Sequence, residues 1–130
     1  MEQYPMTSLA ILAALVLFFV LGALVGAARG KYGVAAPACT GNEHFERRYR
    51  VHMNTLEQLV LFLPAIVLAA PVLGDEITAA LGLFWSVGRI VFARAYYADP
   101  AKRSLGFVLT ITPWAVLLIA AAWGAIATLT

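Results

Sequence analysis

Long apolar stretches dominate this chain, and short polar connections separate them. Four such stretches account for almost all of the 130 residues. A helix that crosses the hydrocarbon core of a bilayer needs about 20 predominantly apolar residues, and each stretch is long enough. The pattern predicts an all-α integral membrane protein, a bundle of four transmembrane helices that forms a single domain. The predicted spans are residues 7–28, 43–70, 76–97 and 100–129.

Proline and helix-capping residues mark the expected starts and bends of these spans. Thr40 or Asn42 is placed to cap the second span, and Asp99-Pro100 is a typical helix start. Pro64 and Pro113 lie inside the second and fourth spans, where each removes one backbone hydrogen bond. We therefore expect both helices to bend at these residues.

Two pairs of residues in the spans have alternative interpretations. Gly22 and Gly26 form a GxxxG pair, which either lets another helix approach closely or reflects the abundance of small residues in membrane spans. Trp114 and Trp123 are either anchors at the membrane interface or packing residues.

The composition supports a lipid environment. Hydrophobic residues make up 62% and charged residues 12% of the chain, and the mean hydropathy is +0.85. A soluble domain of this size cannot bury so much apolar surface, and the four spans leave no room for a separate soluble domain. Because no basic residue precedes the first span, we expect it to be retained rather than cleaved as a secretion signal.

The net charge and the sequence motifs limit the kinds of ligand and partner that we expect this chain to bind. A net charge of +2 gives no reason to expect a nucleic acid. The usual metal and nucleotide motifs do not appear, so neither a metal site nor a nucleotide is predicted. The single cysteine, Cys39, excludes a disulfide within the chain, and an incidental loop residue is a commoner explanation for it than a reactive thiol.

The basic residues are distributed unevenly between the two sides of the predicted membrane. Two connections carry most of them: Arg29, Lys31, Arg47, Arg48 and Arg50 in and after the first, and Arg94, Lys102 and Arg103 around the third. The N-terminus, the second connection and the C-terminus carry no Lys or Arg. The positive-inside rule therefore places the first and third connections in the cytoplasm and both termini on the opposite side.

A polar stripe opens the second span. Arg50, Asn54 and Glu57 stand at i, i+4 and i+7, which is one face of a helix. Charged side chains in lipid cost several kcal/mol, so those that are present usually face a partner or a site. A cation, an amide and a carboxylate on one stripe suit a small zwitterionic ligand.

Arg89 lies inside the third span at a depth comparable to that of Glu57. One interpretation is a buried ion pair between these two residues that locks the helices together. That pair alone leaves several polar residues near the same surface unexplained: Arg50, Asn54, Gln58, Tyr96 and Arg103. We therefore favour a ligand site that faces the cytoplasm.

Two motifs in these spans resemble those of a known family. The first is Phe45-Glu-Arg-x-Tyr-Arg-Val-x-Met-Asn-x-x-Glu57 followed by Leu-Phe-Leu-Pro, and the second is Gly88-Arg89-x-x-Phe-x-x-x-Tyr96-Tyr97 with Arg103-x-x-Gly106. They closely resemble the signature of the MAPEG superfamily, the membrane-associated proteins in eicosanoid and glutathione metabolism. The similarity covers essentially the whole chain. The superfamily includes microsomal glutathione transferases, leukotriene C4 synthase and a non-enzymatic lipoxygenase-activating protein.

The resemblance implies a homotrimer with a glutathione site between neighbouring subunits, near the cytosolic side. Arg103 matches the arginine that holds the glutathione thiolate, which would make it the catalytic residue. The glutathione-binding positions match Arg29, Arg50, Asn54, Glu57, Gln58, Arg89 and Tyr96. Glutathione has two carboxylates and one ammonium group, which suit arginine forks and a glutamate respectively. A lipophilic electrophile would arrive from the lipid bilayer.

The implied activity is that of a membrane-bound glutathione transferase with possible glutathione peroxidase activity, and the short tails are typical of bacterial members in the inner membrane. Three residues depart from leukotriene C4 synthase, namely Phe92, Gln58 and Gly30, and they argue against leukotriene synthesis. A non-catalytic lipid-binding or scaffold protein of the same fold is the alternative. A proton-coupled transporter that uses Glu57 is less favoured, because small four-span exporters more often carry their glutamate in the first span, which is uncharged here.

Overall fold

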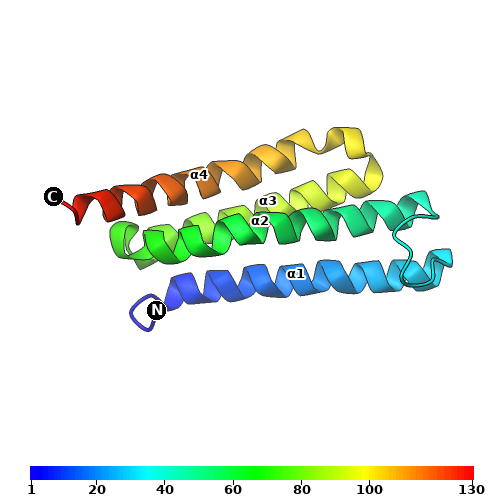
Figure 1. Cartoon of the computed structure of the whole chain (residues 1–130), viewed down its shortest axis with the longest axis horizontal. Coiled ribbons are helices and arrows are strands. Elements are labelled where there is room, and N and C mark those ends of the chain that lie inside the picture. Colours follow the sequence, from blue (N-terminus) through cyan, green and yellow to red (C-terminus); the bar gives the residue numbers. More distant parts are fainter.

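The computed structural model describes residues 1–130 and consists of four long helices that lie side by side (Figure 1). The helices are α1 (Pro5–Tyr32), α2 (Glu43–Leu73), α3 (Asp75–Ala98) and α4 (Ser104–Ala127), and a short 3-10 helix, η1 (Pro100–Lys102), precedes α4. Consecutive helices are antiparallel, so the two termini lie at the same end of the bundle. The predicted fold class, an all-α four-helix membrane bundle, is confirmed.

The surface of the bundle is suited to lipid. All four helices are long and apolar enough to cross a membrane. Their outward side chains are large and hydrophobic, with Phe19 76%, Ile119 69% and Trp123 68% exposed. Apolar surface on this scale does not occur on soluble monomers, so the chain is an integral membrane protein.

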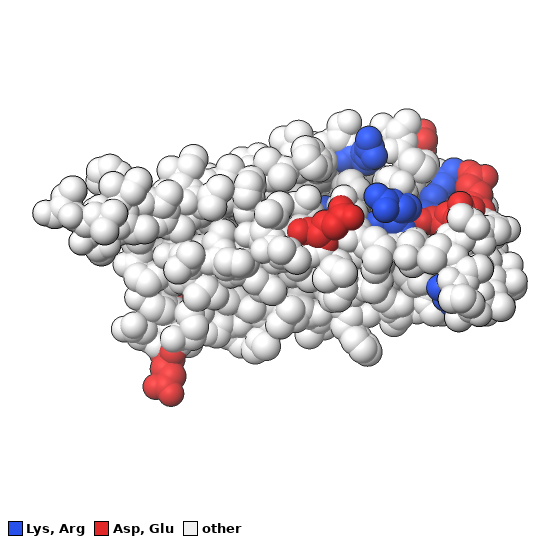
Figure 2. All heavy atoms as spheres, in the orientation of Figure 1, with Lys and Arg blue, Asp and Glu red and all other residues white.

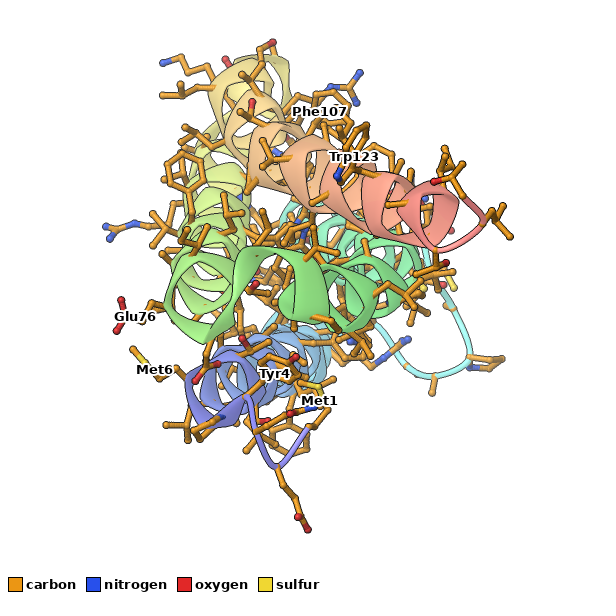
Figure 3. All side chains as sticks on the ribbon, turned by 90° about the vertical axis from the view of Figure 1, so that its left-hand side faces the viewer. Met1, Tyr4, Met6, Glu76, Phe107 and Trp123 are labelled. Atoms are coloured by element: carbon orange, nitrogen blue, oxygen red, sulfur yellow. The ribbon has the colours of Figure 1, made fainter.

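The helices α2 and α3 form the centre of the bundle, and α1 and α4 flank them on opposite sides. Both outer helices pack against both central helices, and Figure 3 shows α1 and α4 well apart when the bundle is seen end-on. All four helices contribute to the largest core cluster, through residues such as Ala14, Phe62, Trp85 and Leu117. The rings of Phe62 and Trp85 stack with centroids 4.2 Å apart.

Side chains form hydrogen bonds with the backbone at the start of α2 and near Pro64. Asn42, one of the two predicted caps, accepts hydrogen bonds from the backbone N–H groups of His44 and Phe45. Near Pro64, the indole Nε1 of Trp114 donates to the carbonyl oxygen of Leu61 at 3.0 Å. Trp114 is therefore a packing residue that ties α4 to α2, whereas Trp123 projects from the bundle (Figure 3).

The two glycines of the GxxxG pair have different surroundings. A Cβ added to Gly22 would lie 2.9 Å from Nε2 of His52, whose ring stacks on Phe18. Gly22 thus makes room for a side chain of α2 within the same chain. A Cβ added to Gly26 would meet nothing within 4 Å.

The N-terminal end of α1 is capped by a residue from another hairpin. The Asp75 carboxylate accepts from the backbone N–H groups of Met6 at 2.9 Å and Thr7 at 2.7 Å, and the Thr7 hydroxyl donates to the Asp75 carbonyl oxygen at 3.2 Å. The first N–H groups of a helix have no partner within it, and a negative charge there also suits the helix dipole. Asp75 therefore holds α1 against the start of α3.

We expect Asp75→Ala to lower the free energy of unfolding by about 1–2 kcal/mol, the usual cost of losing a helix cap. The measurement is unfolding of the detergent-solubilised protein by increasing sodium dodecyl sulfate. Glu76→Ala is the matched control, because Glu76 is the next residue, is exposed and makes no side-chain hydrogen bond. Equal effects of the two substitutions would contradict the capping role.

Candidate functional site

Charged side chains gather at the end of the bundle opposite the termini. Figure 2 shows Lys and Arg atoms concentrated there, where α1 leads into α2 and α3 leads into α4. This is the end that carries both basic connections, as the distribution of Lys and Arg in the sequence requires. The polar stripe of α2 begins at this end.

Arg47 fastens the start of α2 to the end of α3. Its Nη1 donates to the carbonyl oxygens of Tyr97 and Ala98, each at 3.1 Å, and its guanidinium forms an ion pair with Glu43. The last carbonyls of a helix lack partners within it, so a cation is favourable at that point. Directly after α3, Asp99 caps η1 by accepting from the Ala101 N–H at 3.0 Å. These contacts define the path of the chain into Arg103.

Glycines bring α3 and α4 into close contact beside this turn. A Cβ added to Gly106 would lie 2.3 Å from the Cα of Phe92, and one added to Gly88 would lie 2.7 Å from the carbonyl carbon of Leu109. Only residues without a side chain fit at these points. The first turn of α4 is therefore held against Phe92.

Two neighbouring pockets lie along the polar stripe of α2. The inner pocket has a volume of about 360 Å³, and its walls are Asn54, Phe92, Arg103, Ser104, Phe107 and Val108. The outer pocket has a similar volume, about 360 Å³, and its walls are Glu43, Glu46, Arg47, Arg50, Tyr96 and Pro100. Asn54 is one helical turn beyond Arg50, and Tyr96 stacks on Phe92 at 5.6 Å. The two pockets are therefore adjacent.

Each pocket has its own chemistry. The inner pocket combines three polar residues, one of them Arg103, with the apolar side chains of Phe92, Phe107 and Val108. Phe107 and Val108 are also exposed on the lipid-facing surface. The outer pocket is almost wholly polar and contains both carboxylates and guanidinium groups.

Arg89 lies beneath the inner pocket and is completely buried. Its Nη2 donates to Oδ1 of Asn54 at 2.7 Å and to Oγ1 of Thr55 at 2.9 Å. Its Cζ is 4.3 Å from the centroid of the Phe92 ring, a cation–π contact. The alternative that the sequence raised, an ion pair with Glu57, does not form within this chain, because Glu57 is exposed and the only ion pair joins Arg47 and Glu43.

The structure brings together four of the eight predicted site residues. Asn54 and Arg103 line the inner pocket, and Arg50 and Tyr96 line the outer one. The others lie outside both pockets. Glu57 is exposed, and Gln58 is buried with no hydrogen-bond partner for its Oε1.

Arg29 lies in the last turn of α1 and lines neither pocket. Its Nη1 donates to the Ala38 carbonyl oxygen at 2.7 Å, and its guanidinium stacks over the Phe45 ring at 4.7 Å. Within this chain Arg29 thus shapes the connection between α1 and α2.

Several residues that contribute to the site carried no clear signal in the sequence. Ser104 and Phe107 stand in the first turn of a long apolar helix, where similar residues are common. Thr55 is buried, and its hydroxyl donates to the Val51 carbonyl oxygen at 2.8 Å, as a threonine in any helix can. Only its contact with Arg89 reveals a role.

Comparison with known proteins identifies the relatives of this chain. A family model described as the MAPEG family matches residues 6–123. The chain is 48% identical over 108 residues to an uncharacterised protein of Synechocystis, and the alignment covers 83% of this chain and 79% of that protein. It is 34% identical over 100 residues to human microsomal glutathione S-transferase 2, with 77% of this chain and 68% of that protein covered. The mouse protein of the same name is 33% identical over 100 residues, with the same coverage.

We expect Gly106→Ala to lower the free energy of unfolding by about 1–3 kcal/mol, because the added methyl group overpacks the contact with Phe92. The displaced first turn of α4 should also enlarge the inner pocket. Gly26→Ala is the control, since its methyl group meets nothing, and it should leave stability unchanged or raise it by up to about 1 kcal/mol. Unfolding in detergent measures both. If the two variants behaved alike, the close approach of α3 and α4 would be wrong.

Proposed function

The chain belongs to the MAPEG family, and from this membership and the two pockets we propose that it is a membrane-bound glutathione transferase. In this proposal it joins the thiolate of glutathione to lipophilic electrophiles. The observation that carries the proposal is the inner pocket, in which a guanidinium, an amide and a hydroxyl face apolar side chains that reach the lipid surface. A polar sulfur nucleophile and an apolar electrophile can meet in such a pocket.

Arg103 has the catalytic role in this proposal. A thiol with a pKa near about 8.5 is mostly protonated at neutral pH, and only the thiolate is a good nucleophile. A guanidinium beside the sulfur stabilises the negative charge and favours the thiolate. The thiol proton leaves to solvent. The sulfur then uses its electron pair to form the bond to the electrophilic carbon, and the leaving group departs with the electron pair of the broken bond.

In this proposal the outer pocket binds one of the two carboxylates of glutathione. The Arg50 guanidinium can hold a carboxylate with two parallel hydrogen bonds, and the Tyr96 hydroxyl can donate a further one. Neither Arg50 nor Tyr96 makes a side-chain hydrogen bond within the chain, so both are free for a ligand. Arg50 is one turn from Asn54, a spacing that a tripeptide spans easily.

Arg29 and Glu57 belong to the site only in the homotrimer that the resemblance implies. Both lie outside the pockets of their own chain, and Glu57 is exposed on the surface. We propose that neighbouring subunits meet along this surface, which would give Glu57 a partner such as the ammonium group of glutathione. The site would face the cytoplasm of a bacterial cell, with both termini on the other side of the inner membrane.

The first experiment is a calorimetric titration of the detergent-solubilised protein with glutathione. We expect saturable binding that Arg50→Ala abolishes, because one ligand carboxylate loses its guanidinium. Arg103→Ala should leave the dissociation constant within about threefold but lower the turnover of an activated aryl halide by about 10-fold for each unit by which the thiol pKa rises. An organic hydroperoxide, assayed in parallel, tests the peroxidase activity.

Lys102→Ala is the matched control for Arg103→Ala, because Lys102 is the adjacent exposed cation and lines neither pocket. Equal losses of binding and turnover in Arg103→Ala would assign Arg103 to binding rather than to activation of the thiol. Absence of binding to the wild-type protein at millimolar glutathione would refute the transferase proposal and would favour a non-catalytic lipid-binding protein of the same fold.

A further inference from the structure

The buried guanidinium of Arg89 has no carboxylate partner. Both hydrogens of its Nη2 are used, one towards Asn54 Oδ1 and one towards Thr55 Oγ1, and the side chain has no exposed surface. A charge at this depth in a membrane is costly and is usually retained for a function. Arg89 lines neither pocket, so a direct contact with a ligand does not explain its presence.

The hydrogen bond to Arg89 determines which way the amide of Asn54 faces. A guanidinium group has donors only, so the atom of Asn54 that faces it must be the amide oxygen. The amide nitrogen, with its two donors, is then on the other side of the group. Asn54 lines the inner pocket, and its N–H groups are available there.

The orientation of Asn54 gives the inner pocket a wall of hydrogen-bond donors. The polar residues of the pocket are Asn54, Arg103 and Ser104, and no carboxylate is among its lining residues. With the amide oxygen turned away, the Asn54 and Arg103 side chains offer N–H groups only. Such a wall favours a negative ligand atom over a positive one.

Phe92 contacts both the inner pocket and the Arg89 guanidinium. Its ring forms part of the pocket wall and covers the Arg89 guanidinium at 4.3 Å. An aromatic face stabilises a cation that has no carboxylate nearby. Phe92 therefore separates the charge of Arg89 from the pocket while the effect of Arg89 reaches the pocket through Asn54.

We propose that Arg89 is a positioning residue that acts through Asn54, and that the Asn54 amide donates to the same sulfur anion that Arg103 holds. The identity of that anion rests on the proposed function, because glutathione supplies the sulfur. The link between Arg89 and Asn54 does not depend on the ligand. In this assignment Arg89 supports the glutathione site without touching glutathione.

A double-mutant cycle tests the proposal. The variants are Arg89→Met, Asn54→Ala and the combination of both, and the readout is the pH dependence of the ultraviolet absorbance of the bound glutathione thiolate. Each single substitution should raise the pH at which the thiolate forms, and the double variant should shift it no further than Asn54→Ala alone. Arg89→Lys should restore much of the effect, since an ammonium group can still donate to the amide oxygen. Additive shifts would mean that Arg89 contacts the ligand directly and would overturn the proposal.

Asn54→Asp gives a test in which stability and binding change in opposite directions. The new carboxylate can pair with Arg89, so the midpoint of unfolding in detergent should stay the same or rise. The same carboxylate cannot donate and repels an anion, so glutathione affinity should fall at least about tenfold. Unchanged affinity in this variant would show that residue 54 does not face the anion, and the proposal would fail. Arg94→Met controls for loss of an exposed arginine from α3 and should change neither property.

The failure of this proposal can be told apart from failure of the transferase proposal. If the wild-type protein binds no glutathione, the transferase proposal fails, and the same four-variant cycle is measured on the unfolding midpoint without ligand. Coupling between positions 89 and 54 would then support the link, and independent effects would overturn it. If glutathione binds but Arg89→Met lowers only the unfolding midpoint and leaves thiolate formation unchanged, Arg89 is structural and the inference is wrong.

Discussion

Lipid offers no hydrogen-bond partner, so a polar group in the hydrocarbon depends on the bundle for one. Side chains and backbone carbonyls supply such partners at several points, whereas Gln58 Oε1, Trp85 Nε1 and two nitrogens of Arg89, Nε and Nη1, have none within the chain. Thr55 and Thr110 each donate to the carbonyl oxygen one turn earlier in the same helix, and Thr78 donates to that of Gly74, just before α3. Trp114 donates to the Leu61 carbonyl oxygen of α2, near Pro64. Arg89 is the charged member of this set, and the hydrogen bonds of its Nη2 to Asn54 and Thr55 connect α3 to α2 at the level of the site.

The site is supported from two directions, and the two supports are physically different. On one side Arg47 bonds the start of α2 to the last carbonyls of α3, which is an electrostatic contact at the membrane surface. On the other side Gly106 and Gly88 allow backbone-to-side-chain and backbone-to-backbone contact between α3 and α4, which is a steric condition. The short η1 lies between these contacts, and Arg103 is placed at the inner pocket by the path of the chain rather than by a hydrogen bond of its own side chain.

Hydrophobic length and helix periodicity were enough to predict the four helices, the fold class and the shared face of Arg50 and Asn54. These features depend on one helix at a time. The rotation of each helix against its neighbours was not predictable in the same way. Glu57 is only one turn beyond Asn54, yet it is exposed, because the packing of Phe62 on Trp85 decides which side of α2 faces the core. The expected pair with Arg89 therefore does not form. The contact of Gly106 with Phe92 likewise depends on the path of the chain through η1. No local sequence pattern predicts that path.

The cap that Asp75 provides for α1 has a consequence for the biogenesis of the protein. The carboxylate and the Thr7 N–H that it accepts from are 68 residues apart in sequence. When α1 leaves the ribosome and enters the bilayer, Asp75 has not yet been synthesised, so the first N–H groups of α1 must be hydrated at the membrane surface. These N–H groups exchange their hydrogen bonds to water for hydrogen bonds to Asp75 only after α2 has crossed the membrane and α3 has begun. The hydrogen bonds between Asp75 and the start of α1 can therefore form only when the first three helices have been inserted in the correct order and direction.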